Sequence, residues 1–555
     1  MYLSLIVFRK NLPLLLSSFL ILLGAIFIIP YGNFQEAGIV PKFWIGISIM
    51  SLGFVISQAI SSINSAWFWS ITILARLLLI PMEPGDDIWR YLWEGYIQNL
   101  GFSPYDLAPN ATELIPYRTE WWSLINHPDT SAIYPPLSQL GFRTLALISP
   151  SVFIFKLAFV CADLGICWLL TRKFSLEKTL VYAWNPLIIY SFAGGGHYDS
   201  WFLLLLVVAW LTFFQEGRRQ KAKGRSGIYR EILQEGNLPL ETTTNYKQNG
   251  EVFNQNRSTV RSFCFADNYR SYCSAFFVGV SVAIKWMSLP ILCFVAWQKI
   301  LGYREQGTGN REQKRSKITL LYNSDKQQDN IDNICGNWQF DENKVLDNRE
   351  QRLRLGYTRL ICHLKCNLKK IQQAGILLLI GLLPICVAAL NFCASGKCSL
   401  IPTSSNFVVK GRSAEFIPYL VSLVWEQSTK YNWIYGIPLG LAVVVLIWNS
   451  HKFVNFAEWY FFLLLTLSPI VHAWYFTWLI PFAVATNNLG TRWVSLSAFI
   501  YFILKHRQAL GDHNWFLTPM ERYWLWLPLI IGFIWSQWQH KKNSESLKVN
   551  SELSE

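Results

Sequence analysis

The sequence predicts an all-α membrane protein whose helices cross a lipid bilayer many times. Of the 555 residues, 52% are hydrophobic and only 15% are charged, against about 25% charged residues in an ordinary soluble domain. Long apolar runs recur along the chain, and 26 Trp, 24 Tyr and 37 Phe suit the edges of a bilayer. The composition therefore excludes a string of soluble domains, a disordered chain and a secreted disulfide scaffold.

The apolar runs are the predicted transmembrane helices, because about 20 apolar residues cross about 30 Å of hydrocarbon. The breaks at Lys285 and Pro290, and at Ser468-Pro469, each predict a helix pair. The result is a bundle of roughly 12–14 transmembrane helices. The runs are 12–30, 43–62, 66–82, 151–171, 177–193, 199–215, 273–300, 373–393, 433–449, 457–486, 493–505 and 522–539.

Polar segments divide the chain into parts. An N-terminal membrane module contains a long loop, and a C-terminal module precedes a polar tail. Between the modules, a broken helix pair separates two polar insertions that lack hydrophobic periodicity and are expected to be loosely ordered. The boundaries are 1–215 with the loop at 83–150, then 216–272, 273–300, 301–372, 373–540 and 541–555.

The placement of Lys and Arg predicts the orientation. Basic residues gather in the insertions and near both termini, which places those parts in the cytoplasm and the loop 83–150 outside. This requires 134–149 to be an interfacial helix. The same bias explains the net charge of +14 more simply than a nucleic-acid partner, so none is expected. Cys393 and Cys398 then face the outside, where a disulfide can form.

The loop begins with an acidic doublet, Asp86-Asp87, directly after Pro84-Gly85. Asp86 is expected to cap a short helix, with Asp87 in its first turn. In one interpretation these are only helix-start carboxylates, with Arg90 as a local ion-pair partner. In the other they begin a binding site, because the residues that follow suit a polar, ring-shaped substrate: Arg90, Tyr91, Trp93 and Glu94. Asp86, Arg90 and Glu94 recur at helical spacing on one side.

Other candidate site residues are predicted on the same side of the membrane. His127 and Tyr134 lie in the loop, where the aromatic residues could form only an interfacial belt. A Gly-rich turn presents His197 and Asp199, and the break in 457–486 presents His472 and Tyr475. For both of these histidines, a structural hydrogen bond is the competing explanation.

Taken in order, these motifs resemble those of the polytopic GT-C glycosyltransferases, and the resemblance implies a GT-C-like bundle with an external catalytic loop that carries short interfacial helices. They are most similar to the bacterial polyprenyl-phosphate-mannose-dependent mannosyltransferases, like those of glycosyltransferase family 87. The resemblance rests on Arg90-Tyr91-Leu92-Trp93-Glu94-Gly95, Gly101-Phe102-Ser103-Pro104-Tyr105, Ile133-Tyr134-Pro135-Pro136-Leu137, Asn185-Pro186, Gly195-Gly196-His197-Tyr198-Asp199, Ile284-Lys285-Trp286-Met287 and the stretch 467–475.

The resemblance implies transfer of a sugar, by family expectation mannose, from a polyprenyl-phosphate carrier to a hydroxyl of a glycan or glycolipid on the outer face. Asp86 would be the general base, and Asp87 would share that role or orient the acceptor. Lys285 interrupts an apolar run and is predicted to stabilise the leaving phosphate, with snorkelling as the alternative. Independently, Arg76 and Asp163 are expected to pair between two spans.

No cofactor is expected. A divalent metal would need oxygen or nitrogen ligands, and no fixed spacing supports a site among Asp86, Asp87, Glu94, His127 and Asp129. Membrane lipids are the remaining partners. Two alternative functions stay open. A transporter or flippase of lipid-linked sugars should show repeats with broken helices in corresponding halves, which are not apparent. A surface-polysaccharide polymerase or ligase uses neighbouring chemistry.

Overall fold

The computed structural model describes residues 2–214, 255–301, 348–393, 400 and 409–552. Within these residues the chain forms helices and no strand, and one isolated parallel bridge joins Ser413 to Ile470. The predicted all-α fold class is therefore confirmed.

Five helical segments in the described part are long and apolar enough to cross a membrane: Asn11–Tyr31, Ile39–Ser57, Val152–Thr171, Asn367–Ala389 and Asn432–Asn449. Shorter apolar helices occupy Asp199–Phe213, Trp286–Leu301, Phe453–Leu467 and Ala473–Thr486. The protein is thus a multi-pass membrane protein. The number of crossings, roughly 12–14 in the sequence analysis, and the orientation stay predictions.

The chain divides into two compact units. The first comprises Met1–Phe214, Asn268–Leu292 and Gly381–Glu555, and the second comprises Gln215–Asp267 and Cys293–Ile380. Residues 215–254 and 302–347 of the predicted insertions lie outside the described residues. The described parts of the insertions are helical, because α11 (Gln255–Ile284) and α15 (Asn348–Ala389) begin inside them. Neither helix start contains a proline, so nothing in the backbone prevents a span from continuing beyond its apolar run.

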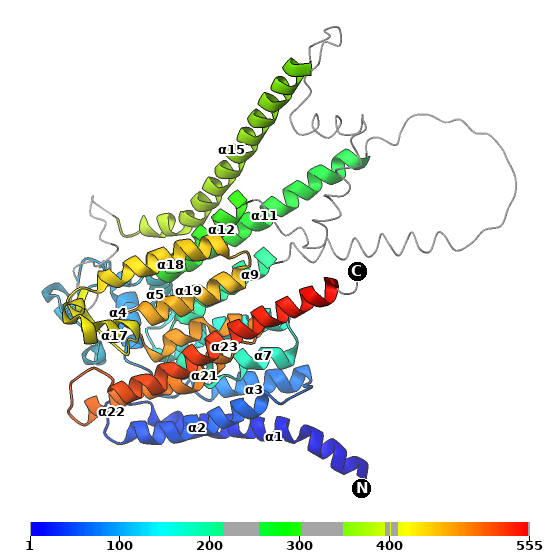
Figure 1. The fold of residues 1–555 in the computed structure, drawn as a ribbon. Helices are drawn as coiled ribbons and strands as arrows, with labels where there is room; N and C mark the ends of the chain where they lie inside the picture. Colours follow the sequence, from blue (N-terminus) through cyan, green and yellow to red (C-terminus); the bar gives the residue numbers. More distant parts are fainter. Residues whose placement is uncertain (1, 215–254, 302–347, 394–399, 401–408, 553–555) are drawn as a thin grey trace. The chain divides into compact units, whose positions relative to one another are not determined.

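The first unit opens with two apolar helices, α1 (Tyr2–Ile28) and α2 (Ile39–Ser57), that lie side by side (Figure 1). A Cβ at Gly24 would lie 2.6 Å from the carbonyl oxygen of Gly46, so glycine permits this close approach. Ser17 Oγ also donates to the carbonyl of Gly53 across 2.7 Å. Small residues therefore allow α1 and α2 to approach each other closely.

A buried ion pair joins α3 (Ser65–Leu77) to α6 (Val152–Thr171). Arg76 Nε lies 2.5 Å from Asp163 Oδ2, and both side chains are fully buried. Tyr182 OH donates to Asp163 Oδ1 across 2.8 Å, so the carboxylate has a second partner from α7 (Leu176–Ala183). The predicted pair is confirmed. Removing one partner of such a pair typically costs about 3–5 kcal/mol.

The predicted span 177–193 is not one helix. It breaks at Asn185, whose Oδ1 accepts hydrogen bonds from the backbone N–H groups of Leu187 and Ile188 and thereby caps α8 (Pro186–Ile189). Pro186 supplies no N–H and fits the first position of a new helix. A π turn, Tyr190–Gly194, follows and leads to α9 (Asp199–Phe214).

The C-terminal part of the first unit contains α17 (Ile417–Val424), α18 (Gly436–Asn449), α19 (Phe453–Leu467), η9 (Ala473–Trp478), α20 (Ile480–Thr486), α21 (Leu489–Ser497), η10 (Ala498–Phe502), α22 (Ile503–Ala509) and α23 (Pro519–Glu552). Helices α21 and α23 pack closely (Figure 1), and a Cβ at Gly532 would lie 2.6 Å from Gly490. Short 3-10 turns occupy Ile29–Tyr31, Thr112–Tyr117, Trp122–Leu124, Trp286–Ser288, Glu426–Thr429 and Asn432–Tyr435.

Candidate functional site

The acidic doublet lies at the start of α4 (Asp87–Asn99), after a turn fixed to another part of the chain. The N–H of Gly85 donates to the carbonyl of Gly195 across 2.9 Å. Asp87 is in the first turn, as predicted. Asp86 occupies the N-cap position but makes no side-chain capping bond, so the prediction that it caps α4 is wrong.

Asp86 instead pairs with a lysine far along the chain. Lys505 Nζ, from α22, lies 2.8 Å from Asp86 Oδ2, and the side chains are 19% and 34% exposed. The ammonium also lies 5.1 Å from the ring centroid of Trp515, whose Nε1 donates to Ser413 Oγ. Asp86 Oδ1 has no hydrogen-bond partner among the described residues. This carboxylate is therefore fixed at one oxygen and accessible at the other.

Both oxygens of Asp87 face donors. Asn126 Nδ2 donates to Oδ1 across 2.8 Å, and His197 Nδ1 lies 3.5 Å from Oδ2. Burial alone would raise the pKa of Asp87. The contacts with His197 and Asn126, together with His472, outweigh burial and hold this pKa well below its ordinary value. Asp87 is therefore a firmly ionised carboxylate.

Two histidines stack on one tryptophan beside the doublet. The ring of Trp474 lies 3.8 Å from that of His197 and 4.6 Å from that of His472, both nearly parallel. Gly196 has a φ of +72°, which favours glycine and allows the turn that buries His197. His472 Nδ1 is hydrogen-bonded to Tyr501 OH at 2.6 Å. Burial lowers the pKa of His472 to about 4, although the charges of Asp87 and Asp86 oppose this, so the ring is neutral at pH 7.

A second charged group forms around Lys285, which lies between the end of α11 and η5 (Trp286–Ser288). Pro290 lacks the N–H that would bond to the carbonyl of residue 286, which explains the helix break. Lys285 Nζ lies 2.5 Å from Asp199 Oδ1, and Trp478 Nε1 donates to the same oxygen across 2.6 Å. The ammonium lies 4.9–5.6 Å from the rings of Tyr198, Phe202, Tyr475 and Trp478. Lys285 is thus enclosed by a carboxylate and aromatic faces.

Arg90 and Glu94 hold the external loop. Arg90 Nε donates to Glu94 Oε1 across 2.8 Å, and the two terminal nitrogens of Arg90 donate to the carbonyls of Asn126, His127, Thr130 and Ser131. All five N–H groups of the guanidinium are therefore engaged within the protein. Glu94 Oε2 accepts from Gln139 of α5 (Pro136–Ile148). Burial raises the pKa of Glu94, and Arg90 and Gln139 oppose that rise.

The aromatic candidates occupy different surroundings. Trp93 is fully buried in a core with Ile97, Leu114 and Ile125. Tyr91 stacks on Phe142 with ring centroids 4.8 Å apart, and Tyr134 and Tyr198 meet it edge to face. His127 has an exposed side chain and a φ of +45°, and its carbonyl accepts from Arg90. The structure therefore brings together Asp86, Asp87, His197 and His472, with Asp199, Lys285 and Tyr475 in the adjoining group, while Arg90, Trp93 and Glu94 pack inside the loop.

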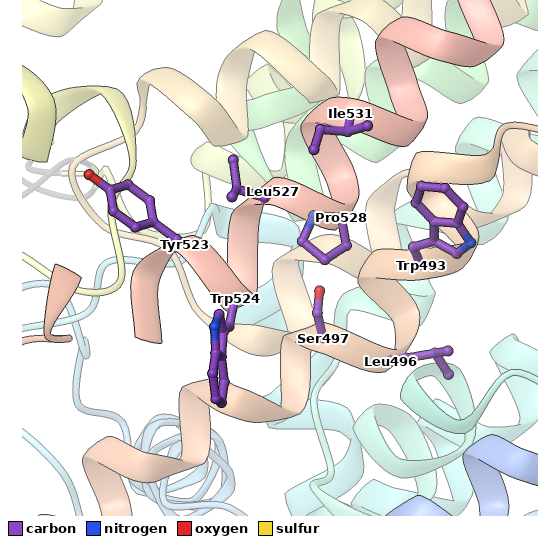
Figure 2. Close-up of a pocket in the computed structure, with 8 residues that line it drawn as sticks. All are labelled: Trp493, Leu496, Ser497, Tyr523, Trp524, Leu527, Pro528 and Ile531. Atoms are coloured by element: carbon purple, nitrogen blue, oxygen red, sulfur yellow. The ribbon is translucent and has the colours of Figure 1, made fainter. Parts of the chain in front are cut away.

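An apolar pocket of about 700 Å³ lies between α21 and α23. Figure 2 shows Trp493, Leu527 and Ile531 among the side chains that line it. Two lining side chains carry a hydroxyl, Ser497 and Tyr523, and that of Ser497 is already engaged with the carbonyl of Leu525. This pocket is suited to hydrocarbon and contains none of the predicted site residues. No group of three or more metal-ligating side chains occurs in the part of the chain that the structure describes.

Sequence reasoning missed Lys505, Asn126, Trp474 and Tyr501 as contributors to the cluster. Lys505 is the last residue of a predicted apolar span, and a charge in that place was a usable signal. Asn126 and Trp474 lie within motifs that were noticed, but neither was selected. Nothing in the sequence pattern indicates that Tyr501 bonds to a histidine.

Residues 35–300 match the model of the MptA/B family, described as alpha-(1->6)-mannopyranosyltransferase, N-terminal domain. This match contains Asp86, Asp87, His197 and Lys285, whereas Lys505 lies beyond it. No curated protein and no solved structure matches the chain significantly.

Proposed function

From the match of residues 35–300 to the MptA/B family of α-(1→6)-mannopyranosyltransferases, we propose that the chain is a membrane mannosyltransferase, and we propose its donor, acceptor and catalytic base. The donor is a polyprenyl-phosphate-linked mannose, and the acceptor is a hydroxyl of a glycan or glycolipid. The supporting observation is the convergence of three distant segments on Asp86 and Asp87: the loop at Asn126, the turn at His197 and α22 at Lys505.

Asp86 is the general base. It is the more exposed acid of the doublet, and its Oδ1 has no partner among the described residues. A base must accept a proton, and the lowered pKa of Asp87 makes that group a weaker base. Asp87, with both oxygens facing donors, instead orients the acceptor. This assignment agrees with the first acid of the doublet as the expected base.

The transfer step balances without a cofactor. The acceptor oxygen forms a bond to the anomeric carbon, and the bond from that carbon to the carrier phosphate breaks. The electron pair goes to the phosphate oxygen, and the hydroxyl proton goes to Asp86. A positioned base contributes typically about 10²–10⁴-fold. Lys285 stays predicted as a cation for the departing phosphate, and its pairing with Asp199 would hold it in place.

The site is proposed to face the exterior of a bacterial plasma membrane, with both termini in the cytoplasm. Cys393 is disulfide-bonded, which favours an oxidising compartment for that loop. Cys398 lies outside the described residues. The test uses Glu113→Cys, at an exposed position of the external loop. A membrane-impermeant maleimide should label this variant in intact cells above the wild-type background, and labelling only after permeabilisation would reverse the orientation.

The pocket between α21 and α23 is proposed to hold the first isoprene units of the carrier. Its Ser497 ends α21, and the chain continues through η10 and α22 to Tyr501 and Lys505. The five 3-10 residues of η10 and the first three residues of α22 together rise about 14–15 Å. The pocket wall therefore leads to the doublet within the length of a few isoprene units. Continuity with the site is the reason to favour the carrier over a bulk phospholipid chain.

The deciding experiment compares wild type with Asp86→Asn. Purified protein is incubated with polyprenyl-phosphate mannose and a mannoside acceptor, and release of polyprenyl phosphate is followed. Wild type should turn over, while Asp86→Asn should lose at least about 100-fold in kcat and keep its thermal unfolding temperature. Near-normal turnover by Asp86→Asn would refute the assignment of Asp86 as the general base. Absence of product in wild type, with movement of the lipid-linked sugar across vesicles, would favour a flippase.

A further inference from the structure

The basic side chains around the doublet differ in how many of their N–H groups are already engaged. Arg90 uses all five. Lys156 is fully buried, and its ammonium donates to the carbonyls of Leu79, Ile80 and Met82, which accounts for its three N–H groups. These two residues hold backbone in place and have no donor left for a ligand.

In the described part of the chain, two further lysines contact an acid of the site: Lys285 pairs with Asp199 and Lys505 pairs with Asp86. Lys285 faces Asp199 and four aromatic rings, which surround its ammonium. Lys505 makes one hydrogen bond among the described residues, to Asp86, and lies against one ring, that of Trp515. Two of its three N–H groups are therefore free to bind a ligand beside the base.

The ligand chemistry follows from this position. The carrier phosphate is a diester with one negative charge in the donor, and it gains a second negative charge when the sugar leaves. A lysine that is already paired with a carboxylate can still donate to such a phosphate, because charge-assisted hydrogen bonds to phosphate are among the strongest in proteins. Lys505 is also partly exposed and lies at the accessible acid of the doublet. Neutral sugar hydroxyls would not need a cation at this position.

We propose that Lys505 binds the phosphate of the lipid carrier and stabilises the charge that develops on it during transfer. The proposal rests on the proposed function and adds a residue from outside the segment that matches the family. When the bond from the anomeric carbon to the phosphate oxygen breaks, that oxygen receives the electron pair, and Lys505 donates a hydrogen bond to it while Asp86 takes the acceptor proton. Lys505 stays protonated, so the step needs no other reactant.

The test measures binding with and without the phosphate. Farnesyl phosphate, farnesol and inorganic phosphate are titrated against purified full-length protein. Lys505→Met should raise the Kd of farnesyl phosphate by about tenfold or more and leave that of farnesol unchanged. Lys505→Arg should restore most of the affinity, because a guanidinium also donates to phosphate. Inorganic phosphate should not compete at equal concentration, since it lacks the lipid; equal competition would refute a carrier site.

Lys42→Met is the matched control. Lys42 is exposed in the first turn of α2, which packs against α22, so this variant removes one positive charge nearby without touching the cluster. Its Kd values should equal those of wild type. The proposal is overturned if Lys505→Met weakens farnesol equally, or if only Lys285→Met weakens farnesyl phosphate. Phosphate-selective loss in Lys505→Met, in a protein that transfers no mannose, would support this inference and refute the proposed function.

Discussion

Asn126 donates a hydrogen bond from Nδ2 to Oδ1 of Asp87, across 2.8 Å and 39 residues of sequence. The backbone next to Asn126 is held by Arg90, which donates to the carbonyls of Asn126 and His127. Arg90 therefore fixes the strip of loop that presents Asn126 to the acid. The loop is a structural part of the site, because it positions a partner for the doublet.

Asn126→Ala should weaken catalysis without unfolding the protein. The variant removes a donor that lowers the pKa of Asp87, so that pKa should rise toward its ordinary value. We expect kcat to fall by about tenfold. This factor corresponds to about 1.4 kcal/mol, close to the free energy that one hydrogen bond to a charged group contributes. The acid side of the pH–rate profile should move to higher pH. The rate at pH 7 checks the first effect, and rates measured down to about pH 3, below the ordinary pKa of an aspartate, check the second.

Asn110→Ala serves as the control for Asn126→Ala, because Asn110 is an exposed asparagine of the same loop. It should leave rate and profile unchanged. If Asn126→Ala has the wild-type rate and the wild-type profile, Asp87 does not depend on this contact.

Arg90→Ala should destabilise the external loop. It leaves the buried carboxylate of Glu94 without its cation and frees four carbonyls. Breaking a buried pair typically costs about 3–5 kcal/mol. Limited proteolysis should therefore cut within 100–135 faster than in wild type. Adding Glu94→Gln should recover part of the loss, because the double variant no longer buries an unpaired charge. Equal proteolysis rates in wild type and Arg90→Ala would contradict the assigned role.

Long apolar helices were predictable because their signal is local. The predicted runs 12–30, 43–62 and 151–171 correspond to α1, α2 and α6 within a few residues at most ends. The break at Asn185 was missed because the flanking residues are apolar on both sides. The helix ends there because Asn185 caps the next helix and Pro186 begins it. The mean hydropathy of the run does not change at these two residues, so it does not reveal the break.

The site was predictable in part, for a related reason. The doublet stands out in sequence, and the helical spacing of Arg90 and Glu94 correctly implied that they share one side of α4. Spacing does not reveal what that side contacts. Here α4 packs on the loop and α5, so both of its sides are buried. The pair of Asp86 and Lys505 spans 419 residues and depends on tertiary packing alone.

The stability of the protein should fall on mild acidification because of His472. Its pKa is about 4 in the folded protein, against an ordinary value of 6.5. Between these pH values the unfolded state binds more protons than the folded state, so the free energy of unfolding rises with pH. Through His472, the free energy of unfolding of the protein falls by at most about 3 kcal/mol between pH 6.5 and pH 4. The thermal unfolding temperature, measured at pH 7.5, 6, 5 and 4.5, should drop, and His472→Phe should flatten that drop.

His513→Phe is the comparison for His472→Phe, because His513 is an exposed histidine of the loop before α23. It should keep the wild-type pH dependence. An unchanged slope in His472→Phe would show that other groups cause the acid sensitivity.

Filling the pocket between α21 and α23 should reduce use of long-chain donors selectively. Leu527→Trp adds an indole to the wall shown in Figure 2. If the carrier's first isoprene units lie there, the KM for a long polyprenyl-phosphate mannose should rise by about tenfold, as expected for losing one or two buried apolar groups. A citronellyl-phosphate donor, too short to fill the pocket, should keep its KM. Ile534→Trp enlarges an exposed residue of α23 that does not line the pocket, so it should change neither value. Equal KM changes for both donors in Leu527→Trp would show that the polyprenyl tail binds elsewhere. The change in KM can depend on the length of the tail only if the tail occupies this pocket.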